Sequence, residues 1–110
     1  MRKLCRVDPA KSEKLFRQLK RFVGKIKKEL PVHTVYLYGS LVKREMHEGS
    51  DIDILVIGDF RERFFDRIGK ILQLTDLPID PLVYTSDEFE ALKKSDNPFI
   101  SEVLKNAVII

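Results

Sequence analysis

Apolar residues recur along the chain in two different spacings, and their order predicts helices interleaved with strands. From Pro9 to Leu30 they repeat every three or four positions, which places them on one stripe of an amphipathic helix that Pro31 ends. The stretch from Phe60 to Thr75 has the same spacing and is also predicted to be a helix. Leu77-Pro78 ends this second helix, because proline cannot continue the hydrogen-bond ladder.

Three other segments are rich in β-branched and aromatic residues, which is typical of buried strands. They are Val32 to Tyr38, Asp51 to Ile57, and Ile79 to Thr85. The continuous apolar run of the second one implies that both faces of the sheet are covered. Leu41 to His47 can form a short helix between the first two strands, and Val108 to Ile110 is expected to add an edge strand.

Two short helices are expected near the C-terminus. Ser86 is in position to cap a helix that runs to Lys94, and Asn97 is in position to cap another that begins at Pro98. The alternation of helices and strands indicates an α/β layer architecture.

The size and composition of the chain favour one domain over residues 1–110. With 110 residues and 44% hydrophobic residues, the chain can bury one core. No apolar run reaches eighteen residues and the N-terminus lacks an apolar stretch, so we expect a soluble, cytoplasmic protein without membrane association. The lone Cys5 cannot form an internal disulfide.

The net charge of +3 is unevenly distributed. The first 28 residues carry eleven Lys and Arg against two acidic residues, whereas nine basic residues meet fifteen acidic ones from Glu29 onward. Because the basic charges are spread along the first helix, a solvated face is favoured over a nucleic-acid surface.

Acidic residues stand at the start of two of the expected strands. Residues two apart on a strand face the same side, so Asp51 and Asp53 present two carboxylates together while the Ile52 side chain enters the core. Asp80 adds a third carboxylate at the start of the third strand. Carboxylates are ligands that Mg²⁺ prefers, and three of them can hold two ions about 3.5 to 4 Å apart.

A glycine-serine turn ends the first expected strand. Gly39 allows close backbone approach, and the start of the following helix offers N–H groups to phosphates, to which Ser40 can add its hydroxyl. If the first strand runs antiparallel to the other two, this turn and the carboxylates gather at one edge of the sheet.

The spacing of these residues resembles a known signature. Gly39-Ser40, ten intervening residues and Asp51-Ile52-Asp53 match the G-S-x10-D-x-D pattern of the DNA polymerase β-like nucleotidyltransferase superfamily. Ile79-Asp80 resembles its third acidic strand, Arg44 stands at its usual basic position, and Asn97 to Ile100 is similar to its closing helix. The similarity extends over almost the whole chain, whose size resembles that of the minimal nucleotidyltransferases of bacteria and archaea. It implies a mixed three- to four-stranded sheet flanked by helices.

This resemblance also implies an activity and its residues. The expected reaction moves a nucleoside monophosphate, AMP from ATP as donor, onto an acceptor hydroxyl with the help of two Mg²⁺ ions. The expected catalytic and metal-binding residues are Asp51, Asp53 and Asp80. The expected nucleotide-binding residues are Gly39, Ser40 and Arg44. Many such proteins are antitoxins paired with a helical HEPN toxin, and some AMPylate that partner. Larger members carry a separate acceptor domain that this length does not provide, so a partner or a second copy in a homo-oligomer is expected to supply acceptor recognition.

Other interpretations stay open at this point. The chain could be a non-catalytic antitoxin that neutralises its partner by occlusion, or a transferase acting on a small molecule or RNA. A nucleic-acid binder that uses the basic first helix is a third alternative. It predicts that nucleic-acid binding weakens steeply as the salt concentration rises. No interleaved aromatic residues support base stacking on this helix.

Four positions near the motif have a plain structural interpretation as well. Pro81 follows Asp80 and removes a backbone donor, which a strand tolerates only at a sheet edge, a strand start or a bulge. Tyr36 and Tyr38 alternate with apolar residues and are expected to pack on the sheet. A solvated helix face is as reasonable for Arg44 as a contact to the triphosphate.

Overall fold

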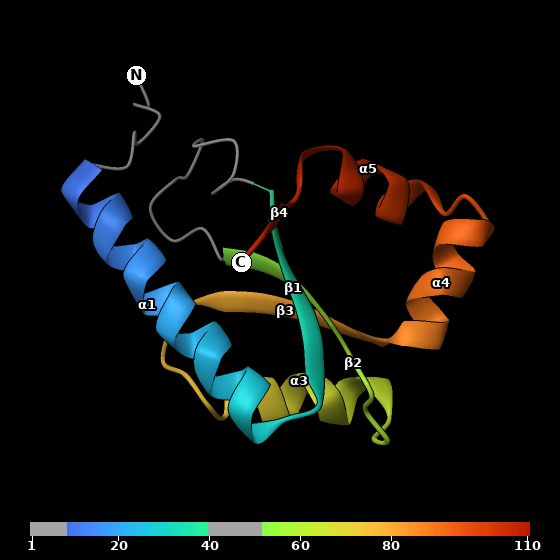
Figure 1. Cartoon of the computed structure of the whole chain (residues 1–110), viewed down its shortest axis with the longest axis horizontal. Helices are drawn as coiled ribbons and strands as arrows, with labels where there is room; N and C mark the ends of the chain where they lie inside the picture. The colour runs from blue at the N-terminus through green and yellow to red at the C-terminus, as the bar shows by residue number, and fades with distance from the viewer. Residues whose placement is uncertain (1–8, 40–51) are drawn as a thin grey trace.

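Four strands of the described residues form one mixed sheet, in the order β3-β2-β1-β4 (Figure 1). The computed structural model describes residues 9–39 and 52–110, with the side chains of the first helix from Glu13 onward. The elements in chain order are α1 (Pro9–Glu29), β1 (Val32–Tyr38), β2 (Ile52–Gly58), α3 (Phe64–Leu72), β3 (Ile79–Thr85), α4 (Ser86–Lys94), α5 (Pro98–Asn106) and β4 (Val108–Ile109). The helix expected over Leu41–His47 lies outside the described residues.

The directions of the strands gather three strand ends at one edge of the sheet. Strand β2 lies between β1, which is antiparallel to it, and β3, which is parallel to it. The C-terminal end of β1 therefore lies beside the N-terminal ends of β2 and β3, which confirms the condition set by the sequence. Strand β4 pairs antiparallel with the other side of β1. Pro81 belongs to β3, an edge strand, where a missing N–H is tolerated.

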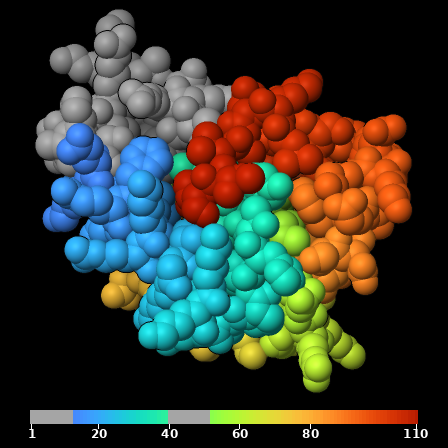
Figure 2. Space-filling view, in the orientation of Figure 1, coloured from blue at the N-terminus to red at the C-terminus, as the bar shows by residue number. Residues whose placement is uncertain are grey.

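Helices cover both faces of the sheet. On one face, α1 and α3 pack over a core cluster that includes Ile54 and Val56 of β2. On the other face, α4 and α5 pack over Leu55 and Ile57. All four side chains are buried, as the apolar run of β2 predicted. Figure 2 shows the C-terminal residues, in red, against α1, and Ile110 packs on the same cluster as α1. None of the helices in the described part of the chain is long and apolar enough to span a membrane.

Helix α3 is shorter than its apolar spacing predicted, because residues at both ends of the spacing pack from loops. Phe60 is buried, with 5% of its surface exposed, but lies outside the helix, and the N-cap Arg63 has an extended backbone. After the helix, Thr75 Oγ1 accepts a hydrogen bond from the N–H of Leu77 at 3.1 Å, a local bond that competes with helical pairing.

Side-chain caps define the starts of the two C-terminal helices. Asn97 Oδ1 accepts hydrogen bonds from the N–H groups of Phe99 and Ile100 at 3.0 and 3.2 Å, which confirms its predicted role. The prediction that Ser86 caps α4 was wrong, because Thr85 does so. Thr85 Oγ1 accepts from the N–H of Glu88, and the Glu88 carboxylate accepts from the N–H of Thr85. This capping box satisfies two N–H groups at once, whereas Ser86 alone would satisfy one.

The buried side chain of Arg67 connects α3, β3 and α4 near the C-terminal end of β3. Arg67 is 7% exposed and donates hydrogen bonds to the backbone oxygens of Glu62 and Val83, at 2.7 and 3.3 Å. It also donates to Glu88 Oε1 at 2.7 Å, and this bond holds the pKa of Glu88 below its usual range. Because Glu88 also caps α4, one ion pair fixes three elements.

Candidate active site

The register of three strands brings two of the predicted carboxylates together. Asp53 of β2 is paired with Tyr38 of β1 on one side and with Asp80 of β3 on the other. Residues paired in this way point to the same face, and their strands lie about 4.8 Å apart. Asp53 and Asp80 therefore present neighbouring carboxylates on the face that α4 and α5 cover. Asp53 is half-buried, and Asp80 is exposed.

Gly39 follows β1 and packs against the carboxylate of Asp53. Its backbone has φ 75°, in the left-handed region that side chains rarely adopt. A Cβ at this position would overlap Asp53 Oδ2. The turn therefore requires glycine for two reasons, its backbone angle and the close approach of the carboxylate.

The remaining predicted site residues, Ser40, Arg44 and Asp51, lie outside the described residues. Their assignments to phosphate and metal binding stay predictions. Within residues 13–39 and 52–110, no group of three or more His, Cys, Asp or Glu side chains is arranged to hold a metal ion. Asp51, one of the three predicted carboxylates, does not belong to that part of the chain.

The surroundings of Tyr38 raise the pKa of its phenol. Burial raises its pKa, and the negative charges of Asp53 and Asp80 raise it further, with a smaller effect from Tyr84. The hydroxyl of Tyr38 therefore stays protonated and can donate a hydrogen bond. The expectation of sheet packing describes Tyr36, whose ring centroid lies 5.9 Å from that of Phe89. Tyr38 packs on the same cluster, as expected, and also borders the carboxylates.

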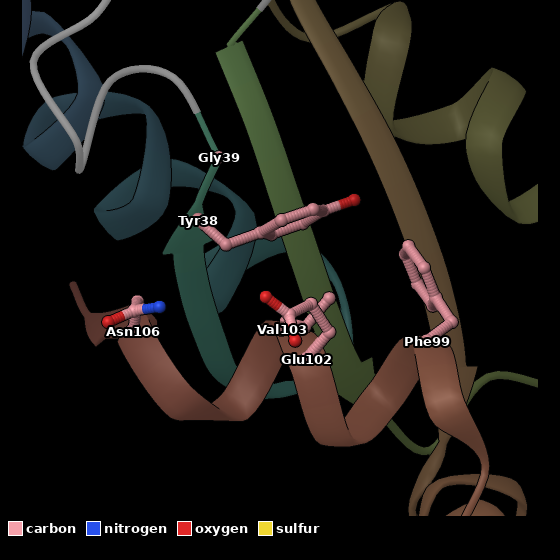
Figure 3. Close-up of a pocket in the computed structure, with 6 residues that line it drawn as sticks. All are labelled: Tyr38, Gly39, Phe99, Glu102, Val103 and Asn106. Carbon is pink, nitrogen blue, oxygen red and sulfur yellow. The ribbon is translucent and has the colours of Figure 1, made fainter.

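A pocket of about 150 Å³ opens beside Gly39, between β1 and α5 (Figure 3). Its lining residues are Tyr38, Gly39, Phe99, Glu102, Val103 and Asn106. The rings of Tyr38 and Phe99 meet edge to face, with their centroids 6.1 Å apart. Figure 3 shows the Tyr38 side chain extending across β2 toward β3, with the side chains of α5 along its other side.

The four pocket residues of α5 were missed by the sequence analysis. Their spacing is i, i+3, i+4 and i+7, which places Phe99, Glu102, Val103 and Asn106 on one stripe of a helix. This periodicity could have grouped them, but only the tertiary fold shows that the stripe faces the end of β1.

A comparison with known protein families shows to which family the chain belongs. The family described as polymerase β, nucleotidyltransferase, matches residues 20–110. The chain belongs to the polymerase β nucleotidyltransferase family. The match includes Gly39 and the strands that carry Asp53 and Asp80, and it confirms the resemblance recognised in the sequence. No curated protein sequence matches this family member.

Two solved structures resemble this nucleotidyltransferase-family chain. The crystal structure of a candidate nucleotidyltransferase from Sulfolobus solfataricus has a TM-score of 0.64 and 22% sequence identity, over 89% of this chain and 80% of that one. The crystal structure of a toxin-antitoxin with AMP-PNP has a TM-score of 0.45 and 16% identity, over 78% of this chain and 84% of that one. The first similarity, together with the sheet observed here, confirms the predicted α/β fold of a mixed sheet flanked by helices.

Proposed function

We propose that this chain transfers a nucleoside monophosphate, AMP from ATP, to an acceptor hydroxyl in a Mg²⁺-dependent reaction. The observation that carries this proposal is the strand register, which sets Asp53 beside Asp80 and against Gly39. Membership of the nucleotidyltransferase family supports the same class of reaction. The turn at Gly39 would then hold the triphosphate of the donor, and the carboxylates would lie beside the α-phosphate that reacts.

The side chains at this edge fit a divalent cation. Asp53 and Asp80 project carboxylate oxygens from strands about 4.8 Å apart, which is close enough for both to reach one ion. Asp80 is exposed, so water molecules and substrate phosphates can reach the remaining coordination positions of a Mg²⁺ ion. Mg²⁺ held by these residues and Asp51 would neutralise the negative charge that builds up on the triphosphate.

The residues of the chain position the reactants. Gly39, without a Cβ, lets the backbone approach the phosphates, and the protonated hydroxyl of Tyr38 can donate a hydrogen bond to a phosphate oxygen. The exposed Asp80 is open to the acceptor hydroxyl and receives its proton. The acceptor oxygen forms a bond to the α-phosphorus while the bond to the oxygen that bridges to the β-phosphate breaks, and pyrophosphate leaves. Catalysis then depends mainly on positioning and charge neutralisation.

We further propose that the acceptor is a helical HEPN-type toxin, which makes this chain its antitoxin. The resemblance to the minimal nucleotidyltransferases supports this partner. The edge strand β4 provides a surface for it, because Val108 and Ile109 are 49% and 64% exposed. A second copy of the chain could use the same surface in a homo-oligomer.

The experiment is transfer from ATP labelled at the α-phosphate, with the chain purified from its native host together with bound proteins and supplied with Mg²⁺. We expect label on a co-purified protein, no label on it from γ-labelled ATP, and none with Asp53→Asn. Label on RNA or a small molecule would retain the transferase but overturn the toxin as acceptor. A toxin that is neutralised without any adduct would overturn transfer in favour of occlusion.

A further inference from the structure

We propose that the pocket between Tyr38 and α5 binds the nucleobase of the donor nucleotide, and that it selects a base with an amino group, as in adenine. This inference rests on the proposed function, because it assigns one part of the donor substrate to one part of the same site. The arguments are the position, the size and the chemistry of the pocket.

The position of the pocket follows from the two residues that it shares with the carboxylate edge. Gly39 contacts the Asp53 carboxylate and also lines the pocket, and Tyr38 is paired with Asp53. A nucleotide has its phosphates at one end and its base at the other. If the phosphates lie at Gly39 and the carboxylates, the opening beside Gly39 gives the base a place between Tyr38 and α5 (Figure 3).

The size of the pocket fits part of a nucleotide. Sites that enclose a complete drug-sized ligand usually measure about 300 to 1,000 Å³. The volume here is about 150 Å³. One planar ring system would therefore fill it, while the ribose and the phosphates would lie outside toward the carboxylates.

The walls of the pocket are suited to a planar ring. The rings of Tyr38 and Phe99 stand nearly perpendicular, at 84°, so a base that lies flat on one ring meets the other at its edge. Val103 contributes an apolar wall. Phe99 is 45% exposed, which leaves much of its ring free of protein contact and open to a base.

Two polar residues set the preference for an amino group. The Glu102 carboxylate only accepts hydrogen bonds, and its negative charge disfavours a phosphate in this pocket. Its ion pair with Lys105 is long, at 3.5 Å, and exposed, so it leaves the carboxylate available. Asn106 can pair both the amino group and the ring nitrogen of adenine, as asparagine does in nucleic-acid recognition. Uracil has no amino group to offer either residue.

The test compares two ligands by calorimetry in the presence of Mg²⁺: α,β-methylene-ATP, which cannot transfer AMP, and inorganic tripolyphosphate, which has no nucleoside. Wild-type protein is expected to bind the nucleotide more tightly. Phe99→Ala should weaken nucleotide binding on the order of tenfold, because a lost base stack accounts for that much, and should leave tripolyphosphate binding unchanged. Phe99→Leu gives the same comparison if the alanine variant fails to fold.

Phe65→Ala is the matched control, because Phe65 is an 82% exposed phenylalanine on α3, away from the pocket. It should change neither affinity. Glu102→Gln should reduce the preference for α,β-methylene-ATP over α,β-methylene-UTP without changing tripolyphosphate binding. Equal binding of nucleotide and tripolyphosphate by wild-type protein would overturn the pocket and leave the transferase intact. Binding of neither ligand would overturn the pocket and the proposed function together.

Discussion

Acidic side chains lie near both ends of strand β3, and their surroundings differ. At the C-terminal end, the carboxylate of Glu88 meets the buried guanidinium of Arg67 at 2.7 Å. At the N-terminal end, the carboxylates of Asp80 and Asp53 lie side by side, and burial together with their charge raises the pKa of Tyr38. The first arrangement pairs opposite charges, and the second places two carboxylates next to each other.

This difference separates a structural site from a functional one. An ion pair that anchors a buried arginine and also caps a helix holds elements of the chain together. Neighbouring carboxylates repel each other, and a cation would relieve this repulsion. We therefore expect substitutions at the Glu88 end to change stability and substitutions at the Asp53 end to change activity.

The largest effect on stability is expected from Glu88→Ala. It should lower the free energy of unfolding by about 3 kcal/mol, because it leaves the Arg67 guanidinium buried without a counter-charge and removes the capping box of α4. Urea unfolding measures this. Glu90→Ala is the matched control on the same helix, where an exposed pair with Lys93 should contribute no more than about 0.5 kcal/mol.

The same pair predicts a pH dependence. The pKa of Glu88 is lower in the folded chain than the 4.5 of the free side chain, so its stabilisation is complete above pH 4.5 and is lost as the pH falls further. The difference in stability between wild type and Glu88→Ala should therefore shrink below pH 4.5. A constant difference would show that the charge of Glu88 does not matter.

Asp53→Asn should reduce activity and leave stability unharmed. Loss of an outer contact of a metal site costs about 10- to 100-fold, so loss of a ligand should lower nucleotide transfer by at least about 100-fold. Stability without metal should be kept or raised, because repulsion between Asp53 and Asp80 is relieved. Steady-state transfer and thermal unfolding measure the two effects. Asp59→Asn, at the other end of β2 beside His33, should transfer normally. Undiminished transfer by Asp53→Asn would remove this residue from the mechanism.

Gly39→Ala should affect both properties to a smaller extent. The left-handed backbone alone should cost about 1 to 2 kcal/mol of stability, and the added Cβ should displace the Asp53 carboxylate and reduce transfer. Gly69→Ala in α3 is the control, because its Cβ would have no neighbour within 4 Å. That variant should be as stable as wild type or more so. The close contact at Gly39 would be unimportant if both variants behaved alike.

The smallest effect concerns the phenol of Tyr38. Because its pKa is raised on folding, the unfolded chain releases its proton first, so stability should fall as the pH rises above 10. Tyr38→Phe should reduce this loss. Asp53→Asn should lower the pKa of Tyr38 by removing one negative charge, which ultraviolet titration of the phenolate can detect. An unchanged titration would contradict the proximity of Tyr38 to this carboxylate.

Much of the fold could be predicted from local patterns. The strand Ile79–Thr85 and the cap at Asn97 were assigned correctly, because β-branched runs and capping residues act over a few positions. The placement of Asp53 on the face opposite Ile54 followed from the two-residue period of a strand. Local patterns failed for α3, where Phe60 belongs to the core but not to the helix.

The candidate site was only partly predictable. The sequence named Asp53, Asp80 and Gly39, but the register that pairs Asp53 with Asp80 depends on how three strands assemble. The burial of Arg67 and the position of Phe99 beside Tyr38 depend on contacts between residues far apart in the chain. No local pattern contains that information.

The most direct test of the carboxylate edge is a crystal structure of the chain with Mn²⁺ and α,β-methylene-ATP, in which anomalous scattering locates the cation. We predict that Asp53 and Asp80 both coordinate Mn²⁺ directly and that the triphosphate lies against Gly39. A cation bound elsewhere, or a nucleotide whose phosphates lie away from this edge, would contradict the account.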